Sequence, residues 1–257
     1  MEQPDPNNAI RLENVSVAYR VPHERIGTLK EYVIRWAQRR VKYEKFLALN
    51  NVSLTINRGE IVGLIGHNGA GKSTLLKLVS RVLAPTSGRV WVRGKVAPLL
   101  ELGAGFHPEL TGRENIYLNG AILGYSRKEM DQKSERIIDF AELGEFIDAP
   151  IRTYSSGMWA RLGFAVATDT KPDILILDEV MSVGDEAFQR KSEAKMRAYF
   201  EMGATILLVS HNMDTIEKLC TRAVWLDHGV IRNVSDPIEV INTYRKGQTG
   251  TLVSDIK

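Results

Sequence analysis

Two kinds of hydrophobic pattern predict the strands of this chain. Residues 10–19 and 48–56 roughly alternate apolar with polar side chains, which is typical of half-buried strands at an antiparallel edge. Residues 61–65, 174–177 and 205–209 are almost entirely apolar, which is typical of parallel strands covered on both faces. The chain is therefore expected to contain a buried parallel sheet and a separate antiparallel edge.

Helical spacing of apolar residues predicts the segments between these strands. It favours one helix over 73–82 and a group of helices over 111–123, over 127–143 and from Trp159 onward. The group predicts a helical subdomain, over about residues 96–171, inserted into the α/β domain.

Three further elements are expected from local signals. Residues 90–96 are predicted to form a single strand, and Asp227-His228-Gly229 predicts the turn of a hairpin. Asp236-Pro237 predicts the start of a helix, and 247–257 is expected to be a polar tail.

Residues 21–47 form a basic insertion. Apolar residues recur on one face and Thr28 with Glu31 forms a capping box, so a helix is predicted here. A basic amphipathic helix can lie against anionic lipid or a membrane partner, and it can equally be a solvated face packed on its own domain. The sequence leaves both interpretations open.

Composition limits the classes of function. The chain has 257 residues, of which 44% are hydrophobic, and this suits one large folded domain. Its net charge of only +3 gives no support for nucleic-acid binding. The single cysteine, Cys220, excludes an internal disulfide and favours a reducing compartment. No apolar run approaches the roughly 20 residues that span a bilayer, and the first residues are too polar for a signal peptide.

The stretch from Gly66 to Thr74 has the spacing of a phosphate-binding loop, Gly-x-x-x-x-Gly-Lys-Ser, between a predicted strand and a predicted helix. Glycines in such a loop let backbone N–H groups turn toward phosphate oxygens, Lys72 adds a positive charge, and the Ser73 hydroxyl can bind Mg²⁺. A cradle for the phosphates of ATP is therefore predicted.

Carboxylates and a histidine follow the buried strands. Asp178 and Glu179 end one apolar run, and His211 follows the next. A phosphate cradle elsewhere in the chain favours Asp178 as a Mg²⁺ ligand acting through water and Glu179 as the residue that polarises the attacking water. Small hydroxyl residues at 154–158 precede a helix and form either an ordinary cap or an anion site. Tyr19, at a strand end, packs on the edge or stacks on a base.

In this order the motifs resemble those of the nucleotide-binding subunit of an ABC transporter, over residues 1–246. The resemblance implies an α/β P-loop NTPase fold. Its RecA-like parallel core would take residues 1–95 and 172–246, together with the antiparallel β edge and the inserted helical subdomain. The cofactors that it implies are ATP and Mg²⁺.

The resemblance also implies roles for single residues. Glu179 would be the general base, His211 a contact to the γ-phosphate, and Asp185 part of the loop called the D-loop. Ser73 and Asp178 would hold Mg²⁺. The residues implied to bind nucleotide are Tyr19, Gly66, His67, Asn68, Gly69, Ala70, Gly71, Lys72, Ser73 and Thr74. The residues implied to reach the ATP of a partner subunit are Ser155, Ser156, Gly157 and Met158.

Two departures from the family pattern stand out. Its usual signature Leu-Ser-Gly-Gly-Gln is replaced by Tyr-Ser-Ser-Gly-Met at 154–158. The usual glutamine at the start of the helical subdomain is missing, since the chain has none between Gln38 and Gln132. Glu101 is the nearest polar residue that could take the place of this glutamine and make its metal contact. Counting back from Thr111 by the usual family spacing places Leu102 at that position instead.

The departures resemble a subfamily, the exporters of lipid-linked polysaccharides such as O-antigen, capsule and teichoic acid. This implies an ATPase that acts as a homodimer with two interfacial ATP sites, together with a polytopic permease, on the cytoplasmic face of the inner membrane. Only 46 residues follow His211, so a C-terminal carbohydrate-binding domain is not expected. The alternatives are export of another substrate and, less favoured, a soluble ATPase of this type acting on nucleic acid or ribosomes.

Overall fold

A computed structural model gives the fold of most of the chain. It describes residues 5–22, 43–99, 102–169, 172–178, 184–210 and 212–254. The helix predicted within the basic insertion falls mainly on 23–42, outside the described residues. At the ends of that insertion the backbone is strand, because β1 extends to Pro22 and β2 begins at Tyr43.

The described chain forms two compact units. Unit 1 comprises Met1–Thr55, Leu64–Val92 and Ala223–Lys257, and unit 2 comprises Ile56–Gly63 and Arg93–Arg222. The strands form a three-stranded sheet in the order β2-β1-β4 and a six-stranded sheet in the order β5-β6-β7-β3-β8-β9. This mixture of parallel and antiparallel strands confirms the predicted α/β class.

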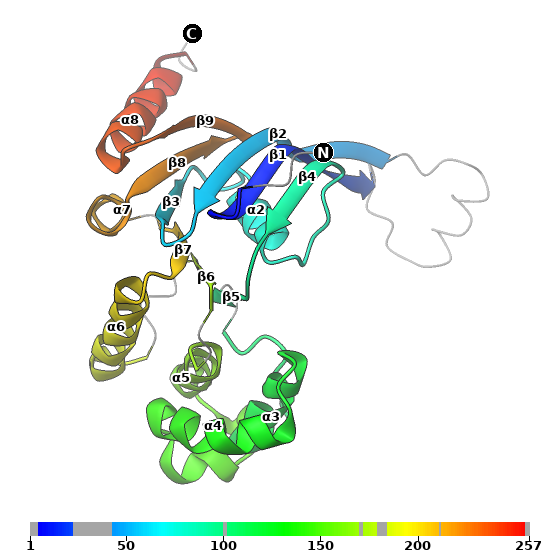
Figure 1. Cartoon of the computed structure of the whole chain (residues 1–257), viewed down its shortest axis with the longest axis vertical. Helices are drawn as coiled ribbons and strands as arrows, with labels where there is room; N and C mark the ends of the chain where they lie inside the picture. The colour runs from blue at the N-terminus through cyan, green and yellow to red at the C-terminus, as the bar shows by residue number, and fades with distance from the viewer. Residues whose placement is uncertain are drawn as a thin grey trace, which may run out of the picture. The chain divides into compact units, whose positions relative to one another are not determined.

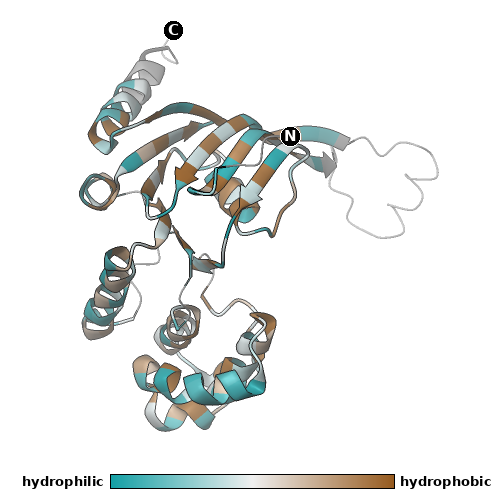
Figure 2. Cartoon of the chain, in the orientation of Figure 1, coloured by the Kyte–Doolittle hydropathy of each residue, from teal (hydrophilic) through white to brown (hydrophobic). Residues whose placement is uncertain are grey.

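The antiparallel edge in unit 1 consists of β1 (Asn8–Pro22), β2 (Tyr43–Asn57) and β4 (Ser87–Val92). Apolar and polar residues alternate along these strands (Figure 2). In β1 the buried positions shift from even to odd residue numbers: Ile10 and Leu12 are buried first, and Val15 and Val17 are buried further along the strand. A strand can change phase while keeping its apolar side chains on one face only if it carries a bulge.

The bulge lies at Asn14. Its φ is +48°, and the β1–β4 register shifts between Glu13 and Ser16. Gly88 lies opposite with a φ of +86°, and a Cβ on it would lie 2.3 Å from the carbonyl oxygen of Asn14. Glycine is required at that position both by its left-handed backbone and by the close approach of β1.

The C-terminal part of unit 1 is a hairpin followed by a helix (Figure 1). Strands β8 (Arg222–Asp227) and β9 (Val230–Ser235) pair antiparallel around the predicted turn. Helix α8 (Pro237–Ser254) begins at the predicted proline, and the ring of Trp225 packs edge-on against Tyr244 with centroids 5.7 Å apart. The segment expected to be a polar tail, from residue 247, is helical as far as Ser254, where α8 ends.

Unit 2 contains the parallel strands β5 (Val96–Leu99), β6 (Ile174–Asp178) and β7 (Thr205–Val209). The single strand predicted over 90–96 is two strands, β4 and β5. The backbone turns at Gly94, whose φ is +100°, and the Lys95 N–H donates to the Asp173 carboxylate at 2.7 Å. The prediction failed because glycine interrupts a run that is otherwise typical of one strand.

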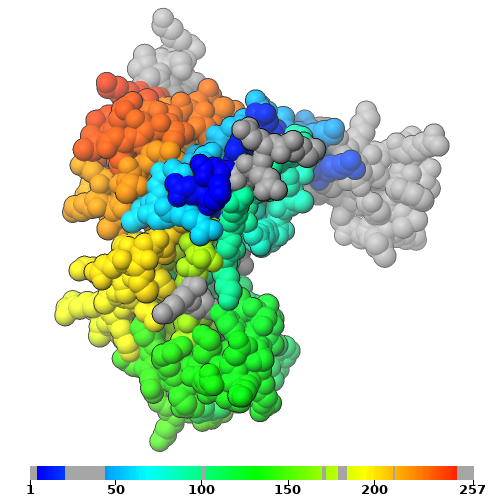
Figure 3. Space-filling view, in the orientation of Figure 1, coloured from blue at the N-terminus to red at the C-terminus, as the bar shows by residue number. Residues whose placement is uncertain are grey.

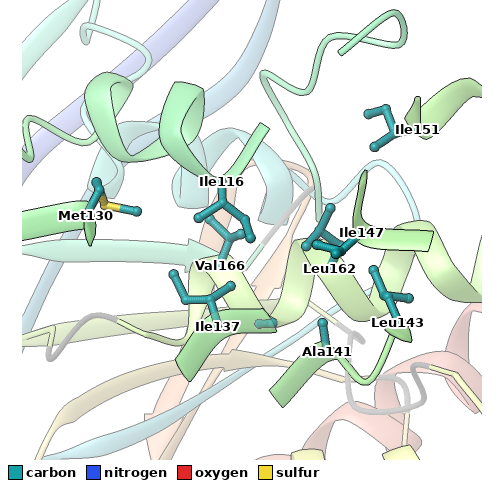
Figure 4. Packing of buried hydrophobic residues seen from close by; sticks show 10 residues of the cluster. Ile116, Met130, Ile137, Ala141, Leu143, Ile147, Ile151, Leu162 and Val166 are labelled. Carbon is teal, nitrogen blue, oxygen red and sulfur yellow. The ribbon is translucent and has the colours of Figure 1, made fainter. Parts of the chain in front are cut away.

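The helical part of unit 2 contains α3 (Gly112–Ile122), α4 (Arg127–Ala141) and α5 (Ser156–Ala167), with short 3₁₀ turns η1 (Gly144–Asp148) and η2 (Ile151–Thr153). In Figure 3 the green surface in the lower part of the view belongs to the segment that contains α3 and α4. Their inward side chains point toward those of α5 (Figure 4). The buried residues of this cluster are Ile116, Met130, Ile137, Ala141, Leu143, Ile147, Ile151, Leu162, Ala165 and Val166.

Both α3 and α4 begin with a complete capping box. Thr111 and Ser126 accept from the backbone N–H three residues on, and Glu114 and Glu129 accept from the backbone N–H of the capping residue. These hydrogen bonds lower the pKa of both glutamates. The two predicted helices are confirmed, and the boxes explain why each starts where it does.

Asn115 holds the loop in front of α3. Its side chain is buried, its Oδ1 accepts from the His107 N–H at 2.6 Å, and its Nδ2 lies 2.8–3.1 Å from the carbonyl oxygens of His107, Leu110 and Thr111. One amide side chain therefore bonds several backbone groups of this loop, in addition to the loop's backbone hydrogen bonds with Ile151 and Arg152.

We expect Asn115→Ala to lower the free energy of unfolding by about 3 kcal/mol, because it removes the hydrogen bonds of a buried side chain and leaves the His107 N–H without its partner. Asn119→Ala is the matched control, since the buried Nδ2 of Asn119, on the same helix, makes no hydrogen bond within the described structure. Urea denaturation of both variants measures the difference. Equal losses would contradict the role given to Asn115.

The remaining helices of unit 2 are α6 (Glu186–Glu201) and α7 (Met213–Leu219). Cys220 follows α7 and is buried, and a Cβ on Gly63 would lie 3.0 Å from its Sγ. Burial raises the pKa of the Cys220 thiol to about 12. The thiol is thus apolar filler, in agreement with the sequence.

We expect Cys220 to react with a disulfide reagent at pH 8 on the order of 1,000-fold more slowly in the native protein than in urea, because only the thiolate attacks. Since the unfolded thiol ionises near 9 and the folded thiol near 12, this group should also make the fold less stable as pH rises above about 9. The chain has no other cysteine, so a rapid native reaction would contradict the burial.

Candidate functional site

The predicted phosphate loop lies in the expected strand–loop–helix setting. Strand β3 (Ile61–Ile65) ends one residue before Gly66, and α2 (Lys72–Val79) begins just after Gly71. Leu75, Leu76, Leu78 and Val79 of α2 are buried, so packing fixes the helix in place. The loop therefore connects two anchored elements.

Two glycines give the loop its shape. Gly71 has a φ of +105°, and a Cβ on it would lie 2.5 Å from the Ala48 carbonyl oxygen of β2. Gly69 has a φ of +83°, with open space where its Cβ would be. Only glycine takes both conformations without strain, so this backbone needs glycine at the positions where the motif has it.

The start of α2 is suited to an anion. The helix has no side-chain cap hydrogen bond at Gly71 and no acidic residue in its first turn. The partial positive charge of a helix N-terminus therefore faces no competing carboxylate from its own first turn. Phosphate is the anion that such glycine-rich loops bind.

The Lys72 ammonium lies over this loop. It donates to the carbonyl oxygens of Gly66 at 2.6 Å and His67 at 3.0 Å. The lysine side chain thus folds back across the loop, which places its charge where phosphate oxygens would lie if the motif binds ATP.

The turn between β8 and β9 is hydrogen-bonded to the phosphate loop. The Gly229 N–H donates to the Ala70 carbonyl at 2.9 Å, and the Gly229 carbonyl accepts from the Asn50 N–H at 2.8 Å. The His67 ring is directed to the same turn, where its Nε2 lies 3.2 Å from Asp227 Oδ1. No sequence motif predicts this contact, because the two residues are far apart in the chain.

The acidic end of β6 is partly described. Asp178 pairs in parallel register with Val209 at the end of β7, so the segments that follow both strands leave the sheet at the same edge. Glu179 and His211 are the next functional candidates on these segments, and both lie outside the described residues. Their roles remain predictions.

The predicted signature starts α5. Ser155 caps the helix, and its Oγ accepts from the Met158 N–H at 3.2 Å. Ser155 and Ser156 are exposed, and a Cβ on Gly157 would have only Ser155 Oγ within 4 Å, at 3.8 Å. The first turn of α5 holds no acidic residue. This exposed, capped helix end is available to an anion from outside the unit.

Asp185 joins the D-loop to the signature helix. It caps α6 by accepting from the Phe188 N–H at 3.0 Å, and its other oxygen forms an ion pair with Arg161 of α5. The Arg161 guanidinium also lies over the Phe188 ring at 5.1 Å. The backbone hydrogen bond from Phe188, with the charge of Arg161, lowers the pKa of Asp185. The structure thus pairs Arg161 with Asp185, a contact that the sequence motifs do not predict.

Glu101 lies outside the described residues, whereas the segment from Leu102 onward is described. The Trp159 ring N–H donates to the Leu102 carbonyl at 3.2 Å, and a Cβ on Gly163 would lie 2.6 Å from the Gly103 nitrogen. The segment that departs from the family pattern is therefore anchored on α5.

Tyr19, predicted to pack on the sheet edge or to stack on a base, lies near the end of β1 and is 36% exposed.

Comparison with known proteins gives the family. A family model described as "ABC transporter" matches residues 49–182, slightly more than half of the chain. An O-antigen export system ATP-binding protein of Klebsiella pneumoniae is 51% identical over 92% of this chain and 97% of its own length. A teichoic acids export ATP-binding protein of Lactococcus lactis is 49% identical over 80% of this chain and 44% of its own length. The chain belongs to the ABC transporter family and is an ATP-binding cassette with ATPase activity.

Solved structures agree on the fold. A dimeric ATP-binding cassette named MJ0796, bound to ADP and Pi, superposes with a TM-score of 0.68 over 89% of this chain and 98% of its own, at 23% identity. The ATP-binding subunit of another ABC transporter gives a TM-score of 0.70 over 92% of this chain. The predicted fold, an ABC ATPase domain, is confirmed.

Proposed function

We propose that this chain is the ATP-hydrolysing subunit of a transporter that exports a lipid-linked polysaccharide. The observation that carries the proposal is 51% identity, over nearly the whole of both chains, to an O-antigen export ATP-binding protein. The similarity to a teichoic acids export ATP-binding protein supports the same substrate class. The two relatives export different polymers, so the substrate class is proposed without naming the sugar.

The proposed chemistry assigns a role to each motif. The loop from Gly66 to Thr74 and the start of α2 bind the phosphates of ATP, and Lys72 balances charge on the β- and γ-phosphates. Glu179 takes a proton from the attacking water, and His211 contacts the γ-phosphate.

Two oxygen-bearing residues suit Mg²⁺, namely the Ser73 hydroxyl at the start of α2 and the Asp178 carboxylate at the end of β6. Oxygen ligands are those that Mg²⁺ prefers, and the bound ion neutralises charge on the phosphates. Glu101 stays a candidate for a further contact in that segment.

We also propose that two copies of the chain share their ATP sites. The exposed start of α5, with Ser155 and Gly157, would contact the γ-phosphate of ATP held by the partner copy. The Ser155 oxygen already accepts from Met158, and its O–H remains able to donate to an anion. The solved cassette similar to this chain is described as dimeric.

Mixing two inactive variants tests the shared site. We expect Lys72→Ala and Gly157→Asp chains, each inactive alone, to regain about a quarter to a half of the wild-type ATPase rate when mixed, because a mixed dimer contains one intact composite site. Hydrolysis should rise more steeply than linearly with protein concentration. No recovery on mixing, with a rate per chain independent of concentration, would contradict the pairing.

The proposed partners include a polytopic permease. No helix in the described part of the chain has the length and apolar character needed to cross a membrane. We propose that the chain binds the permease at the cytoplasmic face of the inner membrane, and that the basic segment 21–47 contributes to that contact. For domain organisation we propose one ABC ATPase domain over 1–246 with its helical subdomain over about 96–171.

ATPase stimulation tests the proposed function. The complex with its permease in liposomes should hydrolyse ATP several-fold faster when a lipid-linked polysaccharide is present than with the lipid carrier alone. Free glycan without lipid is the control. Stimulation by an unrelated substrate instead would favour another exporter, and stimulation by DNA or ribosomes without a permease would favour a soluble ATPase.

A further inference from the structure

Three potential metal ligands converge beside the phosphate loop within unit 1. They are His67 in the loop and Asp227 and His228 in the β8–β9 turn, and one ligand atom from each lies within 4.8 Å of the others. Their side chains play no part in the proposed hydrolysis, which uses only the backbone of His67. The cluster therefore needs its own explanation.

The His67 ring has a fixed orientation and an unsatisfied nitrogen. Its Nδ1 lies 2.6 Å from the Asn68 carbonyl oxygen, which can only accept, so Nδ1 carries the proton. Its Nε2 is buried and makes no hydrogen bond within the described structure, although Asp227 Oδ1 is only 3.2 Å away. The carboxylate is close to this nitrogen but does not lie in hydrogen-bonding geometry. A buried ring nitrogen without a hydrogen bond beside a carboxylate oxygen is explained either by a second proton on the ring or by a cation bound between the two atoms.

The hydrogen bonds that hold His67 and Asp227 in place are of the kind found around metal sites. A histidine that binds metal through one ring nitrogen usually donates from the other to a carbonyl or carboxylate, as His67 does to Asn68. A metal-binding carboxylate is usually held by a further hydrogen bond, and Asp227 Oδ2 accepts from Arg232 Nε at 3.1 Å. Asp227 Oδ1 is thereby left facing both histidines.

His228 completes the group from the solvent side. Its Nε2 lies 3.8 Å from Asp227 Oδ1, its ring centroid lies 4.6 Å from that of His67, and its side chain is 77% exposed. Ligand atoms around a tetrahedral ion with bonds of about 2.0–2.1 Å lie about 3.4 Å apart. The observed separations match this spacing after a small movement of the exposed ring.

The geometry points to a binding site for one zinc-class transition-metal ion, held by His67 Nε2, Asp227 Oδ1 and His228 Nε2, with water in the fourth position. Two imidazoles and one carboxylate favour Zn²⁺, and also Co²⁺ or Ni²⁺, over Mg²⁺, which prefers oxygen ligands. The site is separate from the proposed Mg²⁺ site and does not rest on the export assignment.

A bound ion would fasten the phosphate loop to the hairpin turn. The loop and turn already share the hydrogen bond from Gly229 to Ala70, and Lys72 rests on the carbonyl of His67. The ion would add a second, stronger connection at the residue that holds the lysine. Occupancy should therefore stabilise the nucleotide-free protein against heat.

Metal titration of the untagged full chain, stripped of metal and free of nucleotide, tests the site. Calorimetry with Zn²⁺ should give one ion per chain, and Co²⁺ should give the visible absorption of a four-coordinate complex. His228→Asn and Asp227→Asn should each weaken Zn²⁺ binding at least about tenfold and abolish the rise in melting temperature that Zn²⁺ gives the wild type. Asparagine suits position 228, whose φ is +45°.

His107→Asn is the matched control, because His107 is not among the residues that converge at this site and its change should leave Zn²⁺ affinity unaltered. Circular dichroism establishes that each variant is folded. If the wild type takes up no Zn²⁺, the cluster is an ordinary histidine–aspartate ion pair and the proposal is wrong. If the Asp227 and His228 variants bind Zn²⁺ as tightly as the wild type, the ion sits elsewhere and the proposal is equally wrong.

Discussion

Replacing Glu179 with glutamine should reduce ATP turnover by about 10²- to 10⁴-fold, because the amide keeps the shape of the side chain but cannot accept the proton of the attacking water. ATP binding should stay within about twofold of wild type, since the phosphate loop is untouched. An ATP-bound dimer should then accumulate. Steady-state hydrolysis and nucleotide binding, measured on the same preparation, separate the two effects.

Glu186→Gln is the control for this prediction. Glu186 lies seven residues further on in the first turn of α6, where its exposed carboxylate pairs with Arg190. Exposed pairs of this kind contribute little to stability, so this variant should hydrolyse ATP at close to the wild-type rate. A Glu179→Gln chain that turns over ATP within about twofold of wild type would remove Glu179 from its role.

Gly71→Ala should abolish the phosphate site. The new methyl group would lie 2.5 Å from the Ala48 carbonyl, on backbone that cannot move aside as a flexible side chain does, and at a φ of +105°. We expect a loss of about 3 kcal/mol or more in the free energy of unfolding and a fall of about 100-fold or more in ATP affinity. Urea denaturation and fluorescent nucleotide binding measure these quantities.

Gly124→Ala is the control that separates backbone strain at positive φ from the steric clash with β2. Gly124 has a φ of +85° with nothing within 4 Å of a built Cβ, so its variant carries the left-handed strain alone, about 1–2 kcal/mol. Gly69→Ala, with a φ of +83° and similar open space, should also lose only that amount of stability while still weakening ATP binding. If Gly71→Ala were no less stable than Gly124→Ala, the close approach of β2 would not be what constrains the loop.

The elements with strong periodicity were predictable from the sequence. Strands β6 and β7 are buried throughout their apolar runs, and α3 and α4 begin at the threonine and serine that form capping boxes. Local rules decide such elements, so a single sequence is sufficient. The phosphate loop was predictable for a similar reason, because its glycines are required by the backbone itself.

Features that depend on distant partners were not predictable. The bulge at Asn14 exists because β1 must fit β4, and the chain shows only a change in phase there. The strand break at Gly94 leaves a signal in the sequence, but its anchor does not, because the Lys95 N–H donates to Asp173, 78 residues away. A pattern read along the chain contains no information about such contacts.

In the candidate functional site, too, local motifs were predictable and contacts between distant residues were not. Motif spacing predicted roles for Lys72, Asp178 and residues 154–158, but it did not predict the ion pair between Arg161 of α5 and Asp185 at the start of α6. Nor did it pair His67 with Asp227, although each was noted in a motif. Both pairs join residues from different elements, and only the folded chain brings them together.

ATP-driven transport in liposomes tests the account most directly. The chain, its co-purified permease and a labelled lipid-linked polysaccharide are reconstituted together, and movement of the glycan to the face opposite the ATPase is measured with and without ATP. We expect transport by the wild type with ATP, and none by Glu179→Gln, which binds ATP but does not turn it over. Transport that continues with Glu179→Gln at the wild-type rate, or a complex that hydrolyses ATP but moves no lipid-linked glycan, would contradict the proposed function.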